Sequence, residues 1–258
     1  LLALAAVAYA GWSEEERQVR VDLAACYRLV AAMGLDDLIY NHISVRAPGG
    51  HREFLINPYG LMFEEITASS LVRVGLEGEV LDGSGTEVNL AGFIIHSAVH
   101  AAREDAVCVL HTHSESIVSV ASMPEGFLPL SQFAMWFYRR TGTHPYEGVA
   151  IEADERSRLV RDLGAHRVLL MPNHGILTVG RTVGEAFMLL YYAERAAQIQ
   201  LRTLAALAGR APVLPPHEVC EKAAEQFWGQ EGDIRVPGTR EWPGLLRRLD
   251  RLDPSYRD

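Results

Sequence analysis

Two histidines two residues apart, His111 and His113, follow a continuous apolar segment, 106–110, that is typical of a buried strand. Because side chains alternate along a strand, both imidazoles are expected on the same face. This spacing suits two ligands of one metal ion, with metal–nitrogen distances of about 2.0–2.1 Å. His174 follows a second expected buried strand, 168–171, in a glycine-flanked turn where backbone segments can approach closely.

If the two strands are neighbours, the three histidines form a site with an open coordination position. Three protein ligands and an open position are the arrangement of catalytic zinc. The alternative is that these are unrelated histidines at the ends of loops, because a His-x-His pair is short and common. Spacing alone does not separate the two interpretations.

Composition limits the classes of function. The chain has 258 residues, enough to bury one large core, and 48% of them are hydrophobic. The formal net charge of -9 argues against a nucleic-acid partner, since binding to phosphates requires a basic face. No apolar segment approaches the roughly 20 residues that span a bilayer, so no membrane partner is predicted.

The three cysteines are widely spaced and match neither a disulfide framework nor a cysteine zinc motif, which favours a reducing, cytoplasmic location. The first ten residues are apolar and uncharged. They resemble part of a secretion signal, but no basic segment precedes them. We interpret them as a segment that packs on the body of the protein or on a neighbouring subunit.

The pattern of the chain predicts alternating helices and short strands. Ser13 and Glu16 form a capping box that opens a helix ending at Gly34, and Thr182 and Glu185 form another that opens the longest helix, ending at Gly209. The other expected elements are strands at 42–46, 53–57, 106–110, 168–171 and 176–179, a helical turn from 67, a small hairpin of 72–74 and 79–81, and helices at 89–103 and 154–163. Residues 1–210 are predicted to form one domain, and 211–258 a Pro-rich arm of that domain.

Several segments together resemble the class II aldolase/adducin family. Val107-Cys-Val-Leu-His-Thr-His-Ser is similar to its metal-binding strand, and Met171-Pro-Asn-His-Gly-Ile-Leu-Thr-Val-Gly to its third-ligand turn. Tyr40-Asn-His-Ile-Ser-Val-Arg and Ile56-Asn-Pro-Tyr-Gly-Leu match earlier loops. The segment that begins at Phe54 is closer to the adducin head domain than to the sugar-phosphate aldolases, and the likeness runs from about residue 15 to 210.

The resemblance implies a fold, a metal and an assembly. The expected fold is α/β, a three-layer α/β/α sandwich with a central, mainly antiparallel sheet. The expected cofactor is a divalent metal on His111, His113 and His174, with zinc as first choice and manganese or iron as alternatives. A homo-oligomer, as a tetramer with sites near subunit interfaces, is also implied. The apolar N-terminal segment and the Pro-rich tail, which have no evident place in a lone domain, agree with this.

The sequence departs from the family pattern where the aldolases place their acid/base and phosphate groups. The family resemblance implies a Ser-Ser-Glu before the helix that precedes the metal strand. Aligned on His96, the glutamate falls on Gly92 and the serines on Leu90 and Ala91. The phosphate-binding asparagine of the family is replaced by His42. The usual sugar-phosphate mechanism therefore lacks two of its parts.

Other residues carry weaker signals. His42 could bind a substrate carboxylate or act as a fourth ligand, or it could be a hydrogen-bonded loop histidine. His96 and His100 lie four apart on one helix face, which suits a metal pair but more often reflects packing or surface roles. Glu115 is expected to be a carboxylate at a helix N-terminus, where the helix dipole favours it.

Tyrosines are candidate general acids because the family uses one contributed across a subunit interface. Tyr138, Tyr146 and Tyr256 are the candidates, and nothing local selects among them. The predicted catalytic set is His42, Tyr146 and Tyr256.

Three functional hypotheses follow. The first is a metal-dependent carbon–carbon lyase acting on a small, non-phosphorylated carboxylated substrate, with decarboxylation ahead of aldol cleavage, because decarboxylation needs no base to release carbon dioxide. The second is a non-catalytic, adducin-like interaction protein, against which three converging imidazoles argue. The third is a non-heme iron oxygenase, since imidazole suits iron as well as zinc.

Overall fold

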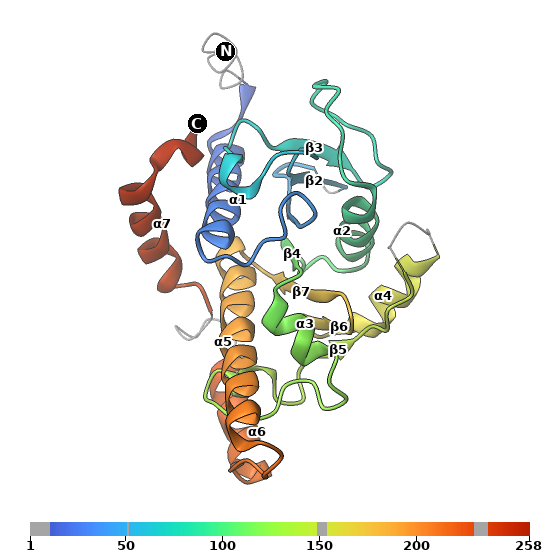
Figure 1. Ribbon diagram of the computed structural model, residues 1–258. Coiled ribbons are helices and arrows are strands. Elements are labelled where there is room, and N and C mark those ends of the chain that lie inside the picture. Colours follow the sequence, from blue (N-terminus) through green and yellow to red (C-terminus); the bar gives the residue numbers. More distant parts are fainter. Residues whose placement is uncertain (1–10, 51, 149–153, 230–236) are drawn as a thin grey trace.

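The computed structural model describes residues 11–50, 52–148, 154–229 and 237–258, and shows a central sheet with helices on both faces (Figure 1). The apolar segment 1–10 lies outside the described residues, so its predicted packing stays a prediction. The seven strands run in the order β3-β2-β1-β4-β7-β6-β5. In chain order they are β1 (His42–Arg46), β2 (Glu53–Ile56), β3 (Val72–Gly75), β4 (Cys108–Thr112), β5 (Gly142–Thr143), β6 (Val168–Met171) and β7 (Gly175–Gly180).

The sheet is mixed. The expectation of a mainly antiparallel sheet is therefore corrected at one edge, where β5 and β6 are parallel. Five neighbouring pairs are antiparallel, whereas β5 pairs with β6 in parallel. Strand β5 has two residues and was not predicted, because so short a segment shows no alternation of apolar side chains. The central pairs carry the site: His42 on β1 lies opposite His111 on β4, and His111 lies opposite Leu177 on β7.

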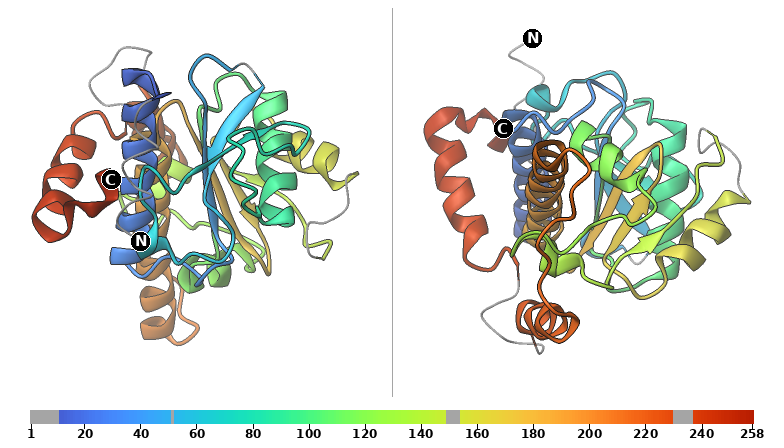
Figure 2. Two further views of the ribbon diagram at one scale, coloured as in Figure 1. Left: turned by 90° about the horizontal axis from the view of Figure 1, so that it is seen from above. Right: turned by 60° about the horizontal axis from the view of Figure 1, so that its bottom comes forward.

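Each face of the sheet is covered by helices, as the two views of Figure 2 show. On one face α1 (Glu14–Ala32), α3 (Glu115–Ala121) and α5 (Val183–Leu207) pack over the larger core. On the other face α2 (Leu90–Ala102) and α4 (Glu155–Leu163) pack over a smaller apolar cluster. The predicted caps form: Ser13 and Thr182 accept hydrogen bonds from the backbone N–H groups of Glu16 and Glu185.

The C-terminal segment, predicted only as a Pro-rich arm, contains two helices, α6 (His217–Trp228) and α7 (Glu241–Leu252). Helix α7 packs against α1 and α5. Trp242 fits against Gly184 of α5, where a β-carbon would come within 2.9 Å of the Trp242 side chain. The apolar stripe of Trp242, Leu245, Leu246 and Leu249 has helical spacing and was a signal for α7. The division at residue 210 stays a prediction.

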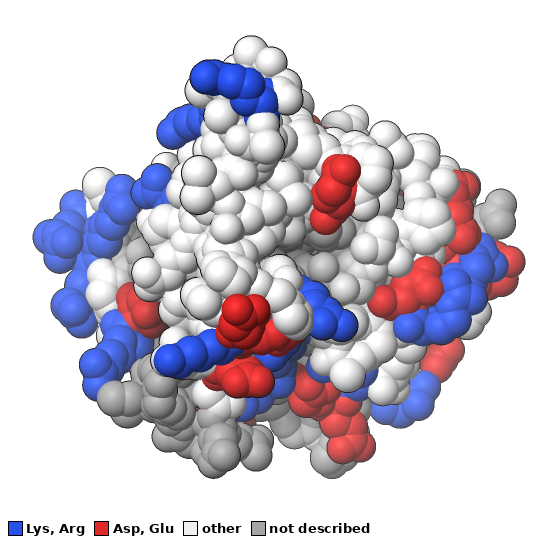
Figure 3. Space-filling view, turned by 90° about the horizontal axis from the view of Figure 1, so that it is seen from below, with Lys and Arg blue, Asp and Glu red and all other residues white. Residues whose placement is uncertain are grey.

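Within the described ranges, no helix has the length and apolar character that crossing a bilayer requires. Acidic and basic side chains are interspersed on the face shown in Figure 3.

Candidate metal centre

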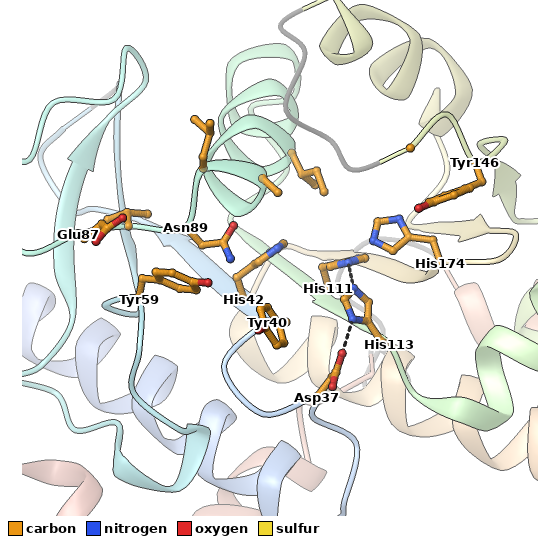
Figure 4. A pocket seen from close by; sticks show the side chains of 15 residues that line it. Asp37, Tyr40, His42, Tyr59, Glu87, Asn89, His111, His113, Tyr146 and His174 are labelled. Carbon is orange, nitrogen blue, oxygen red and sulfur yellow. Dashed lines mark hydrogen bonds and ion pairs between the residues drawn. The ribbon is translucent and has the colours of Figure 1, made fainter.

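The three predicted metal ligands meet at one end of the central strands (Figure 4). His111 is on β4, His113 follows this strand, and His174 is in the turn between β6 and β7. Because β4 and β7 are neighbours, the turn places His174 beside the pair. One nitrogen from each of the three rings lies within 4.8 Å of those of the other two.

Hydrogen bonds orient two of these rings. Nδ1 of His111 donates to the backbone carbonyl of Ile176 at 3.0 Å, and Nδ1 of His113 donates to the Asp37 carboxylate at 2.9 Å. If each ring carries only this one proton, both Nε2 atoms keep their lone pairs, and these two atoms are 3.0 Å apart. A hydrogen bond between them would require one ring to be an imidazolium, and burial opposes this at His111 by lowering its pKa well below its ordinary value.

A cation between these nitrogens fits the arrangement. Tetrahedral zinc with bonds of about 2.0–2.1 Å would separate two imidazole nitrogens by roughly 3.3 Å, close to the distance observed. Imidazole ligands suit zinc and iron, whereas manganese prefers oxygen ligands. The residues present therefore fit a divalent metal held by His111, His113 and His174.

The turn that carries His174 brings the start of β7 close to the backbone at the end of β4. The N–H of His174 donates to the carbonyl of Met171 at 3.0 Å, and Asn173 adopts a left-handed conformation with φ of 61°. A β-carbon at Gly175 would lie 2.3 Å from the carbonyl oxygen of Thr112, so only glycine lets β7 begin here. Burial lowers the pKa of His174 to about 4, which keeps the ring neutral and able to bind a cation at pH 7.

Asp37 is part of the site although nothing in the sequence selected it. It lies in the loop after α1, 76 residues from His113 in the chain. A carboxylate that accepts the second N–H of a metal-binding histidine fixes its orientation and raises its basicity. A lone aspartate in a loop carries no spacing signal, so only the tertiary contact reveals this role.

The histidines open into a cavity of about 580 Å³. Its described lining is aromatic, aliphatic and acidic, and contains no Lys or Arg: Asp37, Tyr40, His42, Tyr59, Glu87, Val88, Asn89, Leu90, Ala91, Ile95, His111, His113, Tyr146, Gly148 and His174. In Figure 4, Glu87 and Tyr59 lie at the opposite end of the cavity from His174 and Tyr146. The described lining therefore offers a substrate no permanent positive charge.

His42 occupies the space next to Gly92. A β-carbon at Gly92 would lie 2.7 Å from Cδ2 of His42, so a larger residue at position 92 is incompatible with this ring position. His42 also stacks on His111, with ring centroids 5.0 Å apart. Burial lowers the pKa of His42 to about 3, which opposes a positive charge on this ring at neutral pH, and its binding of a substrate carboxylate stays a prediction.

His96 and His100 form neither a metal site nor a surface pair. Both are fully buried between α2 and β1, where they join Ser44 and His42 in one hydrogen-bonded chain. Glu115, the first residue of α3, has the predicted position at a helix N-terminus.

The structure separates the candidate tyrosines. Tyr146 lines the cavity, and its ring centroid lies 6.1 Å from that of His174. Tyr138 is hydrogen-bonded to His217. Tyr256 has no exposed surface, belongs to the larger core, and donates its hydroxyl to Asp250. Tyr256 is therefore not part of the cavity lining within this chain, and its predicted catalytic role stays a prediction.

Comparison with known proteins gives a consistent result. A family model described as the class II aldolase and adducin N-terminal domain matches residues 21–201. A putative aldolase class 2 protein from Caulobacter vibrioides is 48% identical over 246 residues, covering 95% of this chain and 94% of that protein. Alpha-adducin from Rattus norvegicus is 38% identical over 253 residues, covering 93% of this chain and 34% of adducin.

The fold agrees as well. A crystal structure of an aldolase II superfamily protein from Pseudomonas syringae superposes with a TM-score of 0.88 at 44% identity, covering 96% of this chain and 98% of that one. The family model, the sequence relatives and the fold therefore agree that this chain belongs to the class II aldolase/adducin family.

Proposed function

We propose that this protein is a metal-dependent carbon–carbon lyase acting on a small, non-phosphorylated carboxylated substrate, with decarboxylation ahead of aldol cleavage. One observation carries the proposal: three imidazoles converge in a cavity whose described lining has no Lys or Arg. A divalent metal, zinc as first choice, would be held by His111, His113 and His174. When bound, the metal would stabilise negative charge on a substrate oxygen next to the bond that breaks.

The charge of the cavity favours a carboxylate over a phosphate. Phosphate groups are normally held by several donors, and Arg is frequent among them. Here Leu90 and Ala91 stand where the family has serines, and His42 is neutral. A carboxylated substrate requires less from the protein, because the cation of the metal centre would balance its charge.

The groups around position 92 favour decarboxylation over aldol cleavage. General acid–base assistance is typically worth about 10²–10⁴-fold in rate, and Gly92 cannot provide it. The His42 ring fills the space beside Gly92, and the three atoms nearest to a β-carbon there all belong to His42 and not to a carboxylate. Release of carbon dioxide requires no base when the electron pair of the broken bond moves onto a carbonyl or phenolic oxygen of the substrate, whose negative charge the metal would stabilise. Reprotonation of the carbon can come from water or from Tyr146.

The direct test is to measure metal content and then reactivity. Purified protein is analysed for bound metal, loaded with zinc, manganese or iron, and screened against hydroxy-acids and aromatic acids for carbon dioxide release. We expect about one metal ion per subunit and carbon dioxide from at least one acid. Efficient cleavage of a sugar phosphate, with no acid decarboxylated, would contradict the proposal. Oxygen consumption by the iron-loaded protein would favour the oxygenase hypothesis.

We also propose a homo-oligomer, as a tetramer, with its cavities near subunit interfaces. Large hydrophobic side chains of the cavity lining are exposed, namely Tyr40, Leu90 and Tyr146, each at least half exposed. Covering them in an interface would remove apolar surface from water and enclose the cavity. Light scattering at micromolar protein concentration is the test, and the mass of a monomer would contradict this proposal.

The second candidate is a non-catalytic interaction protein, which the similarity to alpha-adducin favours. A domain that serves only for interaction does not require converging imidazoles with both Nδ1 groups oriented by acceptors. Metal analysis separates the two candidates: protein isolated without a metal, and unable to bind zinc when it is supplied, would support the adducin-like function.

A further inference from the structure

Behind the cavity wall, four side chains form a continuous hydrogen-bonded chain that ends on a backbone carbonyl. His42 and Ser44 lie two residues apart on β1, and His96 and His100 lie four apart on α2, so each pair faces the other element. The chain runs from His42 to His96, then to Ser44, His100 and the carbonyl of Ala106. All four side chains are buried.

The carbonyl fixes the direction of every hydrogen bond. Nδ1 of His100 lies 2.9 Å from the carbonyl oxygen of Ala106, which can only accept, so Nδ1 carries the His100 proton. Nε2 of His100 is then an acceptor, and the hydroxyl of Ser44 donates to it at 2.7 Å. Because the single hydroxyl proton is used there, Ser44 must accept from its other neighbour.

The same logic continues to the cavity. Nδ1 of His96 donates to the Ser44 oxygen, which leaves Nε2 of His96 as an acceptor. Nδ1 of His42 lies 2.8 Å from that atom and donates to it. The four groups thus supply one proton each to four hydrogen bonds, and Nε2 of His42 is left without a proton.

The surroundings keep the chain neutral. Burial lowers the pKa of His100 to about 3, and that of His96 well below its ordinary value. The charged group that contacts the chain is Arg46, which donates to the backbone carbonyl of His100 and opposes any positive charge on that ring. No carboxylate of the described residues is hydrogen-bonded to any of the three rings.

We propose that His96, Ser44 and His100 are positioning residues that hold His42 with its proton on Nδ1, so that His42 presents an unprotonated Nε2 to a hydroxyl group of the substrate. Within the described chain, Nε2 of His42 has no hydrogen-bond partner, and the ring lines the cavity beside His111. A bare lone pair accepts from a hydroxyl and repels a carboxylate. The inference rests on the proposed function and narrows its substrate class to hydroxy-acids.

The first test reads the tautomer directly and requires no activity. Long-range proton–nitrogen correlation spectra of the ¹⁵N-labelled, metal-free protein report which ring nitrogen of each histidine is protonated. We expect His42 protonated on Nδ1. Ser44→Ala removes the acceptor of His96, so His96 can move its proton to Nε2 and His42 is then expected to gain the Nε2–H form. Ser97→Ala is the matched control, since this buried serine of α2 bonds to Ile94 and Arg156 and lies outside the chain.

If Ser44→Ala does not fold, His100→Phe provides a second route. This substitution keeps an aromatic ring stacked on Phe54 but removes the hydrogen bonds of His100 to Ala106 and Ser44. The Ser44 hydroxyl is then free to donate to His96, which reverses the direction of the remaining hydrogen bonds. We expect the same gain of the Nε2–H form of His42. A wild-type His42 protonated on Nε2, or a tautomer unchanged in every folded variant of the chain, would overturn the positioning role.

The second test measures recognition with two probes that differ in the group offered to His42. L-Lactate carries a hydroxyl donor, and pyruvate carries a carbonyl acceptor. Zinc-loaded wild-type protein is expected to bind lactate more tightly than pyruvate. Ser44→Ala is expected to reduce this preference by about tenfold, because His42 can then act as a donor. Ser97→Ala should keep the preference.

The outcomes separate this inference from the proposed reaction. Equal affinities in the wild type, or no binding of either probe, would overturn the recognition of a hydroxyl. The expected tautomer and probe preference in a protein that releases no carbon dioxide from any acid would support the inference and contradict the proposed decarboxylation.

Discussion

Two clusters of three histidines lie side by side in this molecule, and they differ in where their protons go. In the cluster of His111, His113 and His174, two Nδ1 groups donate to fixed oxygen acceptors, and the Nε2 lone pairs face one another at 3.0 Å. In the cluster of His42, His96 and His100, every ring donates to the next member of a chain that ends on a carbonyl.

The difference shows that burial and residue type do not identify a metal site. Both clusters contain imidazoles on adjoining elements, fully buried in the second cluster and partly buried at His113 and His174 in the first. In the first, two Nε2 atoms that face each other have no proton to share, which suits a cation, whereas the second has a proton for each of its hydrogen bonds. Counting protons against acceptors therefore distinguishes the proposed ligands from the proposed positioning residues.

The largest expected effect tests which cluster binds the metal. Replacing both His111 and His113 by Ala should reduce metal content from about one ion per subunit to nearly none, because one imidazole cannot hold the ion. Ser44→Ala, in the other cluster, should retain the metal. Inductively coupled plasma mass spectrometry gives the content, with His217→Ala as a control on an exposed histidine. Full occupancy in the double variant, or loss in Ser44→Ala, would reverse the assignment.

Acid should destabilise the metal-free protein through both clusters. The pKa values of His42 and His100 are lowered to about 3 and that of His174 to about 4, whereas an unfolded histidine titrates near 6.5. Between these values the unfolded chain binds more protons, so stability falls as the pH is lowered from 6.5 toward 4. Each such histidine adds a slope of up to about 1.4 kcal/mol per pH unit.

Urea denaturation at several pH values measures this slope. His100→Phe removes one of these titrating rings and should reduce the slope by up to about 1.4 kcal/mol per pH unit. His217→Phe, at an exposed position, should leave the slope unchanged. A stability that does not depend on pH between 6.5 and 4.5 would show that the histidines are not held neutral by the fold.

Substitution of Asp37 tests how strongly metal binding depends on the hydrogen bond that orients the His113 ring. Asp37→Asn removes the carboxylate that accepts from Nδ1 of His113, and the metal affinity should fall by about 10–100-fold. Asp36→Asn is the matched control in the same loop. Competition with a chromogenic chelator measures both affinities. Equal affinities in the two variants would mean that the Asp37 contact does not tune the ligand.

The smallest expected effect tests the packing of the second cluster. Gly92→Ala places a β-carbon 2.7 Å from the His42 ring and should cost about 1–3 kcal/mol of stability through overpacking. In a helix this change is otherwise favourable by up to about 1 kcal/mol, as expected for Gly244→Ala in α7, where the nearest atom is 3.7 Å away.

Adding His42→Ala to Gly92→Ala tests whether the two positions are coupled. The small side chain at position 42 should remove most of the penalty, as measured by urea denaturation. A penalty that persists in the double variant would place its origin elsewhere in α2.

The sequence alone predicted the three histidines that converge in the cavity and most of the helices and strands that position them. The His-x-His pair at a strand end, the turn around His174 and the capping residues Ser13 and Thr182 are local patterns, because alternation along a strand and hydrogen bonds at a helix terminus depend on neighbours in the chain. The family resemblance rested on the same segments, and the departure at Gly92 was visible from alignment within them.

The tertiary structure decided what depends on contacts between distant segments. Asp37 reaches His113 across 76 residues, and the role of His96 and His100 depends on facing β1. Tyr256 was a candidate acid by residue type, but the packing of the C-terminal helices buries it in the core. The side chains were present in the sequence, whereas the acceptors for their protons came together only when the chain folded.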